Sequence, residues 1–337
     1  MKIAVLMSGG VDSTLAAILL KEQGHEILGL TMVNWDLDIG IKAKQVADYI
    51  GIEHKTIDLQ DVFRERVIDY FCNTYEKGET PNPCVECNKQ IKFGSLLNIA
   101  LDAGMEFIAT GHYVRKEFNA DTNRHVIKKA HDLSKDQSYF LYGLTQKQLA
   151  HSIFPLGELT KKEVWELAGE KGIEVIEGKE SQEICFIEKD YRDFIEDKVR
   201  FKPGQVVDRN DKILGEHKGL PFYTIGQRRG LGISAGRPIY VIDLDIEKNK
   251  LIVDDEEKLM RKNLLAKENN FIYIDKLKKP MRVDVKIRYR ATYALATIYP
   301  EGNLVKVEFD NLQRAITRGQ SAVYYIGDYL VGGGIIV

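Results

Sequence analysis

Apolar residues in the first 110 positions fall into two alternating kinds of segment. Short apolar runs, typical of buried strands, predict strands at residues 3–7, 26–33, 54–57 and 106–110. Apolar positions at helical spacing predict helices at residues 14–23, 41–49, 61–75 and 89–103. Such alternation is typical of a parallel sheet covered by helices on both faces, so we predict an α/β domain here.

The pattern changes near residue 200. Before it, the sequence predicts a hairpin with its turn at 119–123, a helix that begins with the capping box Thr160-Lys-Lys-Glu163, and a short helix at 190–199. After it, short alternating segments are separated by Gly and Asn turns. We expect an α/β domain at residues 1–199, a central β-rich domain at 200–260 and a barrel-like β domain at 261–337.

Composition narrows the class of protein. The 337 residues are 44% hydrophobic and 29% charged, which is ordinary for a globular chain of two or three domains. No apolar run approaches the length of a membrane span, and the apolar start is too short for a signal peptide, so we expect a cytoplasmic protein. The formal net charge is −2, so a nucleic-acid partner would have to be bound by local basic patches.

A glycine-rich loop joins the first predicted strand to the first helix. Its residues are Ser8, Gly9, Gly10, Val11, Asp12 and Ser13. Small residues between a strand and a helix N-terminus expose a row of backbone N–H groups, and such a row binds phosphate. The loop lacks the lysine of a Walker motif and resembles the PP-loop of enzymes that cleave ATP between the α and β phosphates. The alternative is an ordinary tight turn before a helix.

Two other segments are expected beside this loop. Met32 and Gly111 each stand at the carboxyl end of a predicted strand, and ligands of parallel sheets bind at these ends. We therefore expect the loop, Met32, Gly111 and His112 to border one crevice.

The chain has four cysteines, of which Cys72 lies in an apolar helical run typical of a core. Cys84 and Cys87 follow a Pro-Asn-Pro turn at the start of a predicted helix, where the helix dipole is expected to lower a thiol pKa. Cys185 ends a strand-like run at 181–187. The spacing is compatible with a redox pair, with zinc completed by His112 or His131, or with an iron–sulfur cluster.

A series of motifs then identifies a resemblance. In order, they are Ser8-Gly-Gly-Val-Asp-Ser13, Thr80-Pro-Asn-Pro83, Cys87-Asn-Lys-Gln-Ile-Lys-Phe93, Ala109-Thr-Gly-His-Tyr113, Ser134-Lys-Asp-Gln-Ser-Tyr-Phe-Leu141, Phe154-Pro-Leu-Gly157, Ile184-Cys-Phe-Ile187, Tyr223-Thr-Ile-Gly-Gln-Arg-Arg-Gly-Leu-Gly232, Arg288-Tyr-Arg290, Gly319-Gln-Ser-Ala-Val323 and Gly332-Gly-Gly-Ile-Ile336. Together they resemble the tRNA-specific 2-thiouridylases, the MnmA family, over nearly the whole chain.

The resemblance implies a reaction. The C2 oxygen of the tRNA wobble uridine is adenylated by ATP, with Mg²⁺, and AMP is then displaced by sulfur. It also implies that Cys87 is the nucleophile and that Cys185 carries a persulfide. The sulfur would come from sulfide or from a cysteine desulfurase through a persulfide relay.

One position departs from the family pattern. Cys84 stands where the family usually has an Asp. A thiol is a better iron ligand than a carboxylate, so we favour a [4Fe-4S] cluster on Cys84, Cys87 and Cys185. Persulfide transfer through Cys185 and Cys87 remains the alternative.

The resemblance also assigns binding residues. ATP is expected on residues 8–13, Met32 and Gly111. The tRNA is expected on Asn82, Pro83, His112, Lys135, Asp136, Gln137, Arg288, Tyr289 and Gln320. Two basic patches support an RNA partner: Lys218, Arg228, Arg229 and Arg237 in one, and Arg282, Lys286, Arg288 and Arg290 in the other.

Two other functions stay open at this stage. Another PP-loop adenylating enzyme, such as an amidotransferase-type synthetase or a lysidine synthetase, would not need the three cysteines. A zinc-stabilised RNA-binding protein with a decayed ATP site would hold zinc and release no AMP with tRNA.

Overall fold

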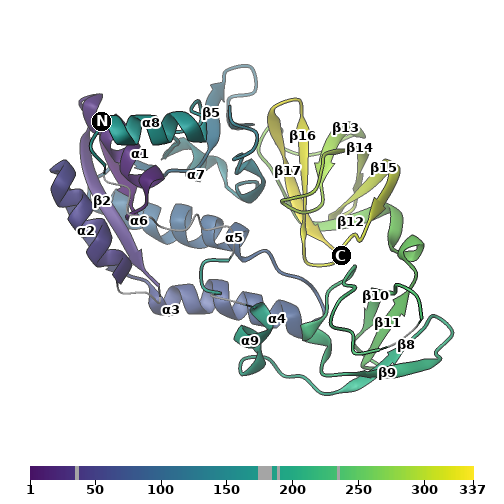
Figure 1. Ribbon diagram of the computed structural model, residues 1–337. Coiled ribbons are helices and arrows are strands. Elements are labelled where there is room, and N and C mark those ends of the chain that lie inside the picture. The colour runs from purple at the N-terminus through teal and green to yellow at the C-terminus, as the bar shows by residue number, and fades with distance from the viewer. Residues whose placement is uncertain (35–37, 174–183, 188–189, 234–235) are drawn as a thin grey trace.

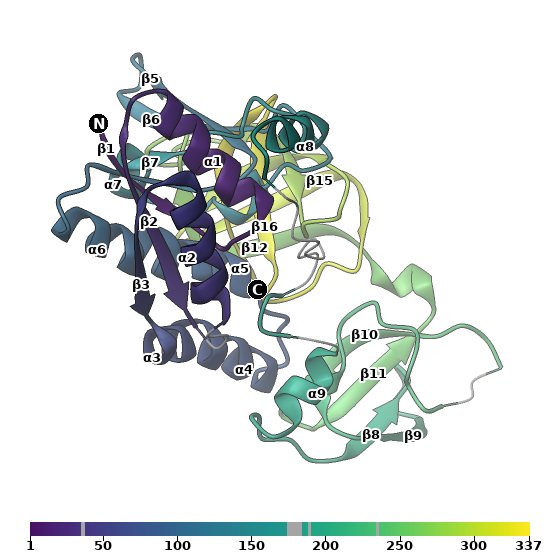
Figure 2. The ribbon, with the colours of Figure 1, turned by 60° about the vertical axis from the view of Figure 1, so that its left-hand side comes forward.

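The computed structural model describes residues 1–34, 38–173, 184–187, 190–233 and 236–337 (Figure 1). The chain forms an α/β domain, a small central β domain and a C-terminal barrel. Figures 1 and 2 both show the barrel beside the α/β domain and the central domain below the barrel. Among the described residues, no helix is long and apolar enough to cross a membrane.

The predicted parallel sheet is confirmed. Its strands are β1 (Lys2–Leu6), β2 (Glu26–Val33), β3 (Glu53–Asp58), β4 (Phe107–Ala109) and β7 (Ser152–Ile153). The order is β3-β2-β1-β4-β7, and each neighbouring pair is parallel. Ile3, Ala4 and Val5 are fully buried in the central strand, as expected for a strand covered on both faces. The two-residue strand β7 was not predicted, because it is too short to give a periodic signal.

Nine α-helices are described, and the first, second and sixth of them pack on this sheet. They are α1 (Val11–Glu22), α2 (Asp38–Ile50), α3 (Gln60–Phe63), α4 (Asp69–Glu76), α5 (Pro83–Glu86), α6 (Leu96–Asp102), α7 (Gln146–Ala150), α8 (Lys161–Glu170) and α9 (Tyr191–Glu196). The predicted capping box of α8 is present, with Thr160 and Glu163 bonded reciprocally. The predicted helix at 61–75 is interrupted by the π-helical segment η1 (Arg64–Ile68), and the predicted helix at 89–103 starts within the π-helical segment η2 (Cys87–Ser95). π-Helical segments occur frequently at functional sites, and η2 begins at Cys87.

The two predicted β regions form separate sheets. In the central region, β8 (Gly204–Val207), β9 (Ile213–His217), β10 (Tyr240–Asp245) and β11 (Lys250–Asp254) pair in the order β10-β11-β8-β9. In the last region the strands are β12 (Met260–Phe271), β13 (Met281–Lys286), β14 (Ala294–Glu301), β15 (Leu304–Arg314), β16 (Ser321–Ile326) and β17 (Tyr329–Ile336). Their order is β12-β15-β14-β13-β16-β17, and pairing between β12 and β17 closes the predicted barrel around its own apolar core.

The predicted hairpin connects two domains. Its strands β5 (Val114–Asn119) and β6 (Arg124–Lys129) belong to the α/β part of the chain, but β6 pairs with β17 at Lys128 and Tyr329. Arg124 donates two hydrogen bonds to backbone oxygens of Phe271 and Ile272, at 2.9 and 2.8 Å. The hairpin therefore fixes the barrel against the α/β domain, a contact that local periodicity does not reveal.

Candidate active site

The glycine-rich loop, residues 8–13, forms a compact turn between β1 and α1 and is called the phosphate loop below. The backbone N–H of Ser8 donates to Ser13 Oγ at 3.2 Å, and Ser13 Oγ donates to the carbonyl oxygen of Gly10 at 3.0 Å. Gly9 has φ +75°, and an added Cβ would lie 3.2 Å from Cβ of Lys42 in α2. A larger residue at Gly9 would be strained, so the loop needs glycine here.

A charged contact lies at the start of α1. Asp12 Oδ1 accepts a hydrogen bond from the Tyr113 hydroxyl and one from Lys161 Nζ, both at 2.7 Å. Lys161 is the first residue of α8, 149 positions away along the chain. Its side chain is only 12% exposed, and its ammonium lies over the rings of Tyr113 and Trp165. Lys161 and Tyr113 were not among the predicted site residues.

The segment after β4 packs directly against the phosphate loop. A Cβ added to Gly111 would lie 2.9 Å from the backbone carbon of Asp12 and 3.0 Å from the nitrogen of Ser13. Met32, at the end of β2, is half-buried. The expected convergence of the phosphate loop with the 111 segment at one edge of the sheet is therefore present.

His112, which directly follows Gly111, is buried. Its Nδ1 is 2.8 Å from Thr110 Oγ1, and its ring lies near Phe93 and Phe154. Burial, and then the positive charge of Lys92, hold the pKa of His112 well below its usual value. The imidazole is therefore neutral, which suits it to hydrogen bonding rather than to binding an RNA phosphate.

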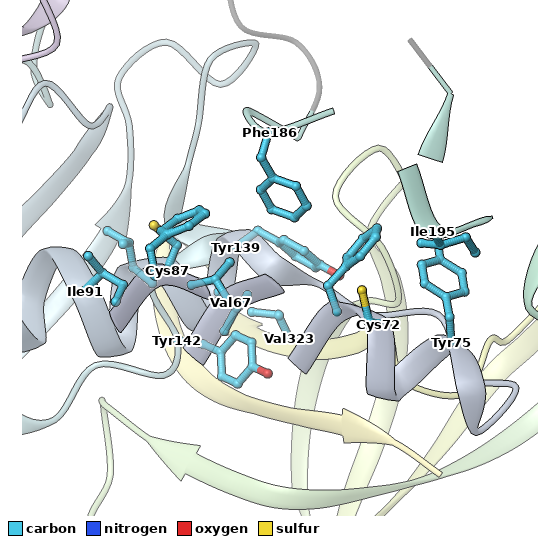
Figure 3. Packing of buried hydrophobic residues seen from close by; sticks show 14 of the residues in the cluster. Val67, Cys72, Tyr75, Cys87, Ile91, Tyr139, Tyr142, Phe186, Ile195 and Val323 are labelled. Atoms are coloured by element: carbon cyan, nitrogen blue, oxygen red, sulfur yellow. The ribbon is translucent and has the colours of Figure 1, made fainter. Parts of the chain in front are cut away.

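The cysteines of the 84–87 motif lie in a continuous helical stretch that begins at Pro83 (Figure 3). Cys87 is 7% exposed, whereas Cys84 is partly exposed. Figure 3 shows Cys87 and Cys72 in different parts of the same apolar cluster. Cys72 is buried in this cluster, which agrees with its predicted role in core packing.

Cys185 is held next to this core by its neighbour. The ring of Phe186 packs edge-on against Phe71, with centroids 5.3 Å apart, and also contacts Phe63 and Phe194. The Ile187 nitrogen donates to the Ile184 oxygen, so residues 184–187 form a turn rather than the predicted strand end. The rest of that strand-like run, 181–183, lies outside the described residues. Cys185 itself is exposed.

The three thiols form one cluster, called the thiol cluster below (Cys84, Cys87 and Cys185). Burial raises the pKa of Cys84 to about 11, and the proximity of Cys185 adds to this rise. Burial also raises the pKa of Cys87 to about 12. The expectation that the helix dipole lowers these pKa values was wrong, because loss of hydration outweighs the dipole for buried thiols.

One cation counteracts this rise. The positive charge of Lys92, five positions after Cys87 in η2, lowers the pKa of each thiol in the cluster. Its position was visible in the Cys-Asn-Lys-Gln-Ile-Lys motif, but its electrostatic effect on all three thiols is apparent only from the structure.

The thiol cluster offers three possible ligands for a metal ion. Sulfur donors suit iron and zinc, and the three thiols act electrostatically on one another. Among the residues that the structure describes, however, no three His, Cys, Asp or Glu side chains are arranged to hold a metal ion. The donor types fit an iron–sulfur cluster, but their arrangement here does not.

The predicted tRNA-binding residues fall into two groups. Asn82 and Pro83 begin α5, and Pro83 is buried. Gln320, from the barrel, donates to the backbone oxygens of Thr80 and Pro81, just before them. In this structure Gln320 therefore contacts protein.

The second group surrounds the 135–137 loop. The buried carboxylate of Asp136 accepts hydrogen bonds from Ala130 N and from Ser138 N and Oγ, while Gln137 Oε1 accepts from Tyr113 N. Lys135 is partly exposed, whereas Asp136 and Gln137 hold the loop in shape. Tyr289 of the barrel packs on Phe140, with ring centroids 4.5 Å apart.

The basic patches remain on the surface. Arg228, Arg229, Arg288 and Arg290 are exposed. Two other members are engaged in ion pairs, Arg237 with Asp254 and Asp255, and Arg282 with Asp310. The exposed arginines are therefore the better candidates for contact with phosphate.

Comparison with known proteins agrees with this organisation. Family models match three consecutive segments: "tRNA methyl transferase HUP domain" at residues 1–189, "tRNA methyl transferase PRC-barrel domain" at 192–255, and "Aminomethyltransferase beta-barrel domain" at 261–336. The fold is thus an N-terminal α/β domain of the HUP type followed by two β-barrel domains.

Relatives match over the whole chain. The tRNA-specific 2-thiouridylase MnmA of Syntrophomonas wolfei is 51% identical over 337 residues, which is 100% of both chains. MnmA 2 of Thermoanaerobacter sp. is 50% identical, covering 99% of this chain and 97% of its own. MnmA of Moorella thermoacetica is 48% identical over 98% of each chain. With about half of all positions identical from end to end, the chain belongs to the family of tRNA-specific 2-thiouridylases, MnmA.

Proposed function

We propose that this protein replaces the C2 oxygen of the wobble uridine of tRNA with sulfur in an ATP-dependent reaction. The observation that carries the proposal is full-length identity of about half to proteins named tRNA-specific 2-thiouridylase. The juxtaposition of a phosphate loop and a thiol cluster in one α/β domain supports it, because the reaction needs a leaving group and a sulfur nucleophile.

The phosphate loop accounts for the first half of the reaction. A uracil carbonyl oxygen is a poor leaving group, so it is first joined to the α-phosphorus of ATP while pyrophosphate leaves. Ser8 to Ser13 are proposed to bind the phosphates through backbone N–H groups and the N-terminus of α1. Mg²⁺, which prefers oxygen ligands, would accompany the phosphates, with the Asp12 carboxylate as its candidate protein ligand. Met32 and Gly111 are proposed to border the nucleoside.

The thiol cluster accounts for the second half. Sulfur attacks C2 of the adenylated base, and AMP leaves with the former carbonyl oxygen. We propose that Cys84, Cys87 and Cys185 would have to move together to hold a [4Fe-4S] cluster, because the arrangement described above does not itself hold a metal ion; when bound, the cluster would supply an iron site for sulfide. Support comes from the donor chemistry and from Cys84 in place of the usual Asp. Lys92 would stabilise the thiolate form of the ligands.

A cluster-free route is the second candidate. The absence of a metal-holding arrangement among the described side chains favours it, as does the contrast between exposed Cys185 and buried Cys87. In this route exposed Cys185 accepts sulfur as a persulfide from a donor protein, and Cys87 takes part in the transfer within the closed site.

Positive charge and aromatic rings support a tRNA partner. Arg228 and Arg229 on the central domain and Arg288 and Arg290 on the barrel are proposed to contact phosphates. Asn82, Pro83, His112, Lys135 and Tyr289 are proposed to lie near the anticodon, where unstacked bases are recognised by hydrogen bonds and stacking. The cytoplasm is the proposed compartment, and the four free cysteines agree with it.

One experiment separates these possibilities. The purified protein is incubated with unmodified tRNA, ATP and Mg²⁺, either with sulfide after anaerobic reconstitution with iron or with a cysteine desulfurase in the absence of iron. Formation of 2-thiouridine in the first arm alone supports the cluster, and formation in the second arm supports the persulfide route. Failure of both arms with intact tRNA binding would contradict the proposed function.

A further inference from the structure

The first turn of α8 carries a charge that helix electrostatics alone does not explain. Lys161 and Lys162 occupy the first two positions, where the positive end of the helix dipole disfavours cations. Lys162 is exposed over 85% of its side chain and pairs with Glu166 in the next turn. Lys161 instead extends to Asp12 of the phosphate loop. A buried cation at this place needs an anion beside it.

Several contacts fix where the Lys161 ammonium lies. The start of α8 is fixed by the Thr160–Glu163 capping box and by a hydrogen bond from Lys161 N to Asp132 Oδ2 at 3.1 Å. The side chain then lies over Tyr113 and Trp165 and ends 2.7 Å from Asp12 Oδ1. This ammonium is therefore positioned at the edge of the phosphate loop before any ligand binds.

The neighbouring carboxylate gives this position a chemical reason. Asp12 lies in the first turn of α1, where the phosphate loop would receive the four negative charges of ATP, and a bare carboxylate there would repel them. Lys161 and the Tyr113 hydroxyl both donate to the same oxygen of Asp12, which reduces that repulsion.

We propose that Lys161 is a further catalytic residue, which contacts the β- and γ-phosphates of ATP and stabilises the pyrophosphate that leaves. In the step itself, the uridine O2 forms a bond to the α-phosphorus, the bond from the α-phosphorus to the bridging oxygen breaks, and the electron pair stays with pyrophosphate. Lys161 keeps its proton and offsets the growing negative charge. The inference rests on the proposed function, since it assigns a role in the same adenylation.

The test compares Lys161→Met with Lys162→Met, which removes the adjacent, exposed ammonium. Binding of inorganic pyrophosphate by calorimetry, without tRNA, and the KM for ATP in tRNA thiolation are both measured. Because Lys161→Met loses a charged hydrogen-bond donor to phosphate, its dissociation constant for pyrophosphate and its KM for ATP should each rise by about 10- to 100-fold. Lys162→Met should change neither constant. Lys161→Arg should recover most of the loss, and the affinity for tRNA should not change.

The outcomes are distinguishable. Lys161→Gln, which keeps a donor to Asp12, serves as the second neutral variant in case Lys161→Met fails to fold. Pyrophosphate affinity and ATP KM equal to those of Lys162→Met in a folded neutral variant would overturn the role of Lys161. If the wild-type protein forms no 2-thiouridine but binds pyrophosphate in a Lys161-dependent manner, the proposed function fails and the phosphate contact stands.

Discussion

The side-chain amide of Gln320 donates hydrogen bonds to the backbone oxygens of Thr80 and Pro81, at 3.1 and 3.0 Å. In the opposite direction, Thr80 N donates to the oxygen of Arg318 at 2.8 Å. Gly319 allows this approach, because an added Cβ would lie 2.8 Å from Thr80 N. The barrel thereby holds the segment that leads directly into Cys84, so it can position the thiol cluster.

We expect Gln320→Ala to lower the thiolation rate and to destabilise the protein by about 1–2 kcal/mol, since two hydrogen bonds between domains are lost. The KM for ATP should not change, because the phosphate loop lies on a different segment. Thermal unfolding and single-turnover thiolation check both points. Gln313→Ala is the control, since Gln313 donates only to Asn311 within its own strand. Weakened tRNA binding with unchanged stability would instead identify Gln320 as a tRNA contact.

Gly111→Ala should disable the phosphate loop. The added methyl group would lie 2.9 Å from the backbone carbon of Asp12 and 3.0 Å from the nitrogen of Ser13, closer than van der Waals contact. Backbone atoms cannot move aside as a flexible side chain can. We expect ATP binding to weaken by about 5- to 150-fold, which corresponds to about 1–3 kcal/mol of overpacking strain. Calorimetric titration with a non-hydrolysable ATP analogue measures the effect.

Gly169→Ala is the matched control for that substitution. Gly169 lies inside α8, and an added Cβ would meet no atom within 4 Å. It should stabilise the protein by about 0.5–1 kcal/mol and leave ATP binding unchanged, because alanine is the better helix former. Equal affinities for ATP in the two variants would show that Gly111 does not support the loop.

These positions also show how far sequence reasoning reaches. The proximity of the phosphate loop and Gly111 could be predicted from the sequence. Both follow strands that local hydrophobic patterns identify, and the carboxyl ends of parallel strands lie at one edge of the sheet. Lys161 could not, because its contact with Asp12 spans 149 residues. The position of Lys161 in the sequence gave one electrostatic indication, because the helix dipole disfavours a lysine at the start of a capped helix unless an anion lies nearby.

The prediction of lowered thiol pKa values was wrong for a different reason. Sequence places Cys84 and Cys87 at a helix start, where the dipole contributes only about 0.3–1 kcal/mol at exposed positions. It does not show that Cys87 will be buried in an apolar cluster that also contains Val85 and Phe93. Burial depends on the packing of the whole domain, and here it sets the sign of the pKa change.

Cys87→Ala should abolish 2-thiouridine formation by either sulfur route while leaving tRNA-dependent release of pyrophosphate. The reason is that the phosphate loop completes adenylation without a thiol. Cys72→Ala is the matched control: Cys72 is likewise buried in the same apolar cluster but outside the thiol cluster, so it should cost only about 1 kcal/mol of stability and retain activity. Liquid chromatography of digested tRNA and a pyrophosphate assay measure the two half-reactions. Full thiolation by Cys87→Ala would show that neither sulfur route depends on Cys87.

The central domain should lose stability in mild acid because of His217. The imidazole is buried, its Nε2 lies 3.2 Å from the Asn249 oxygen, and burial lowers its pKa despite that contact. The unfolded chain takes up a proton as the pH falls below about 6.5, whereas the folded histidine does not. The stabilisation is therefore present above that pH and is lost progressively as the pH falls.

His217→Gln keeps a side-chain donor for Asn249 and removes the titration. The midpoint of thermal unfolding should therefore fall less between pH 7.5 and 5.5 in His217→Gln than in the wild-type protein. His54, His112 and His125, whose pKa values are also lowered, are present in both proteins and cancel in the comparison. A pH dependence of His217→Gln as steep as that of the wild type would mean that the folded state protonates His217 as readily as the unfolded chain does.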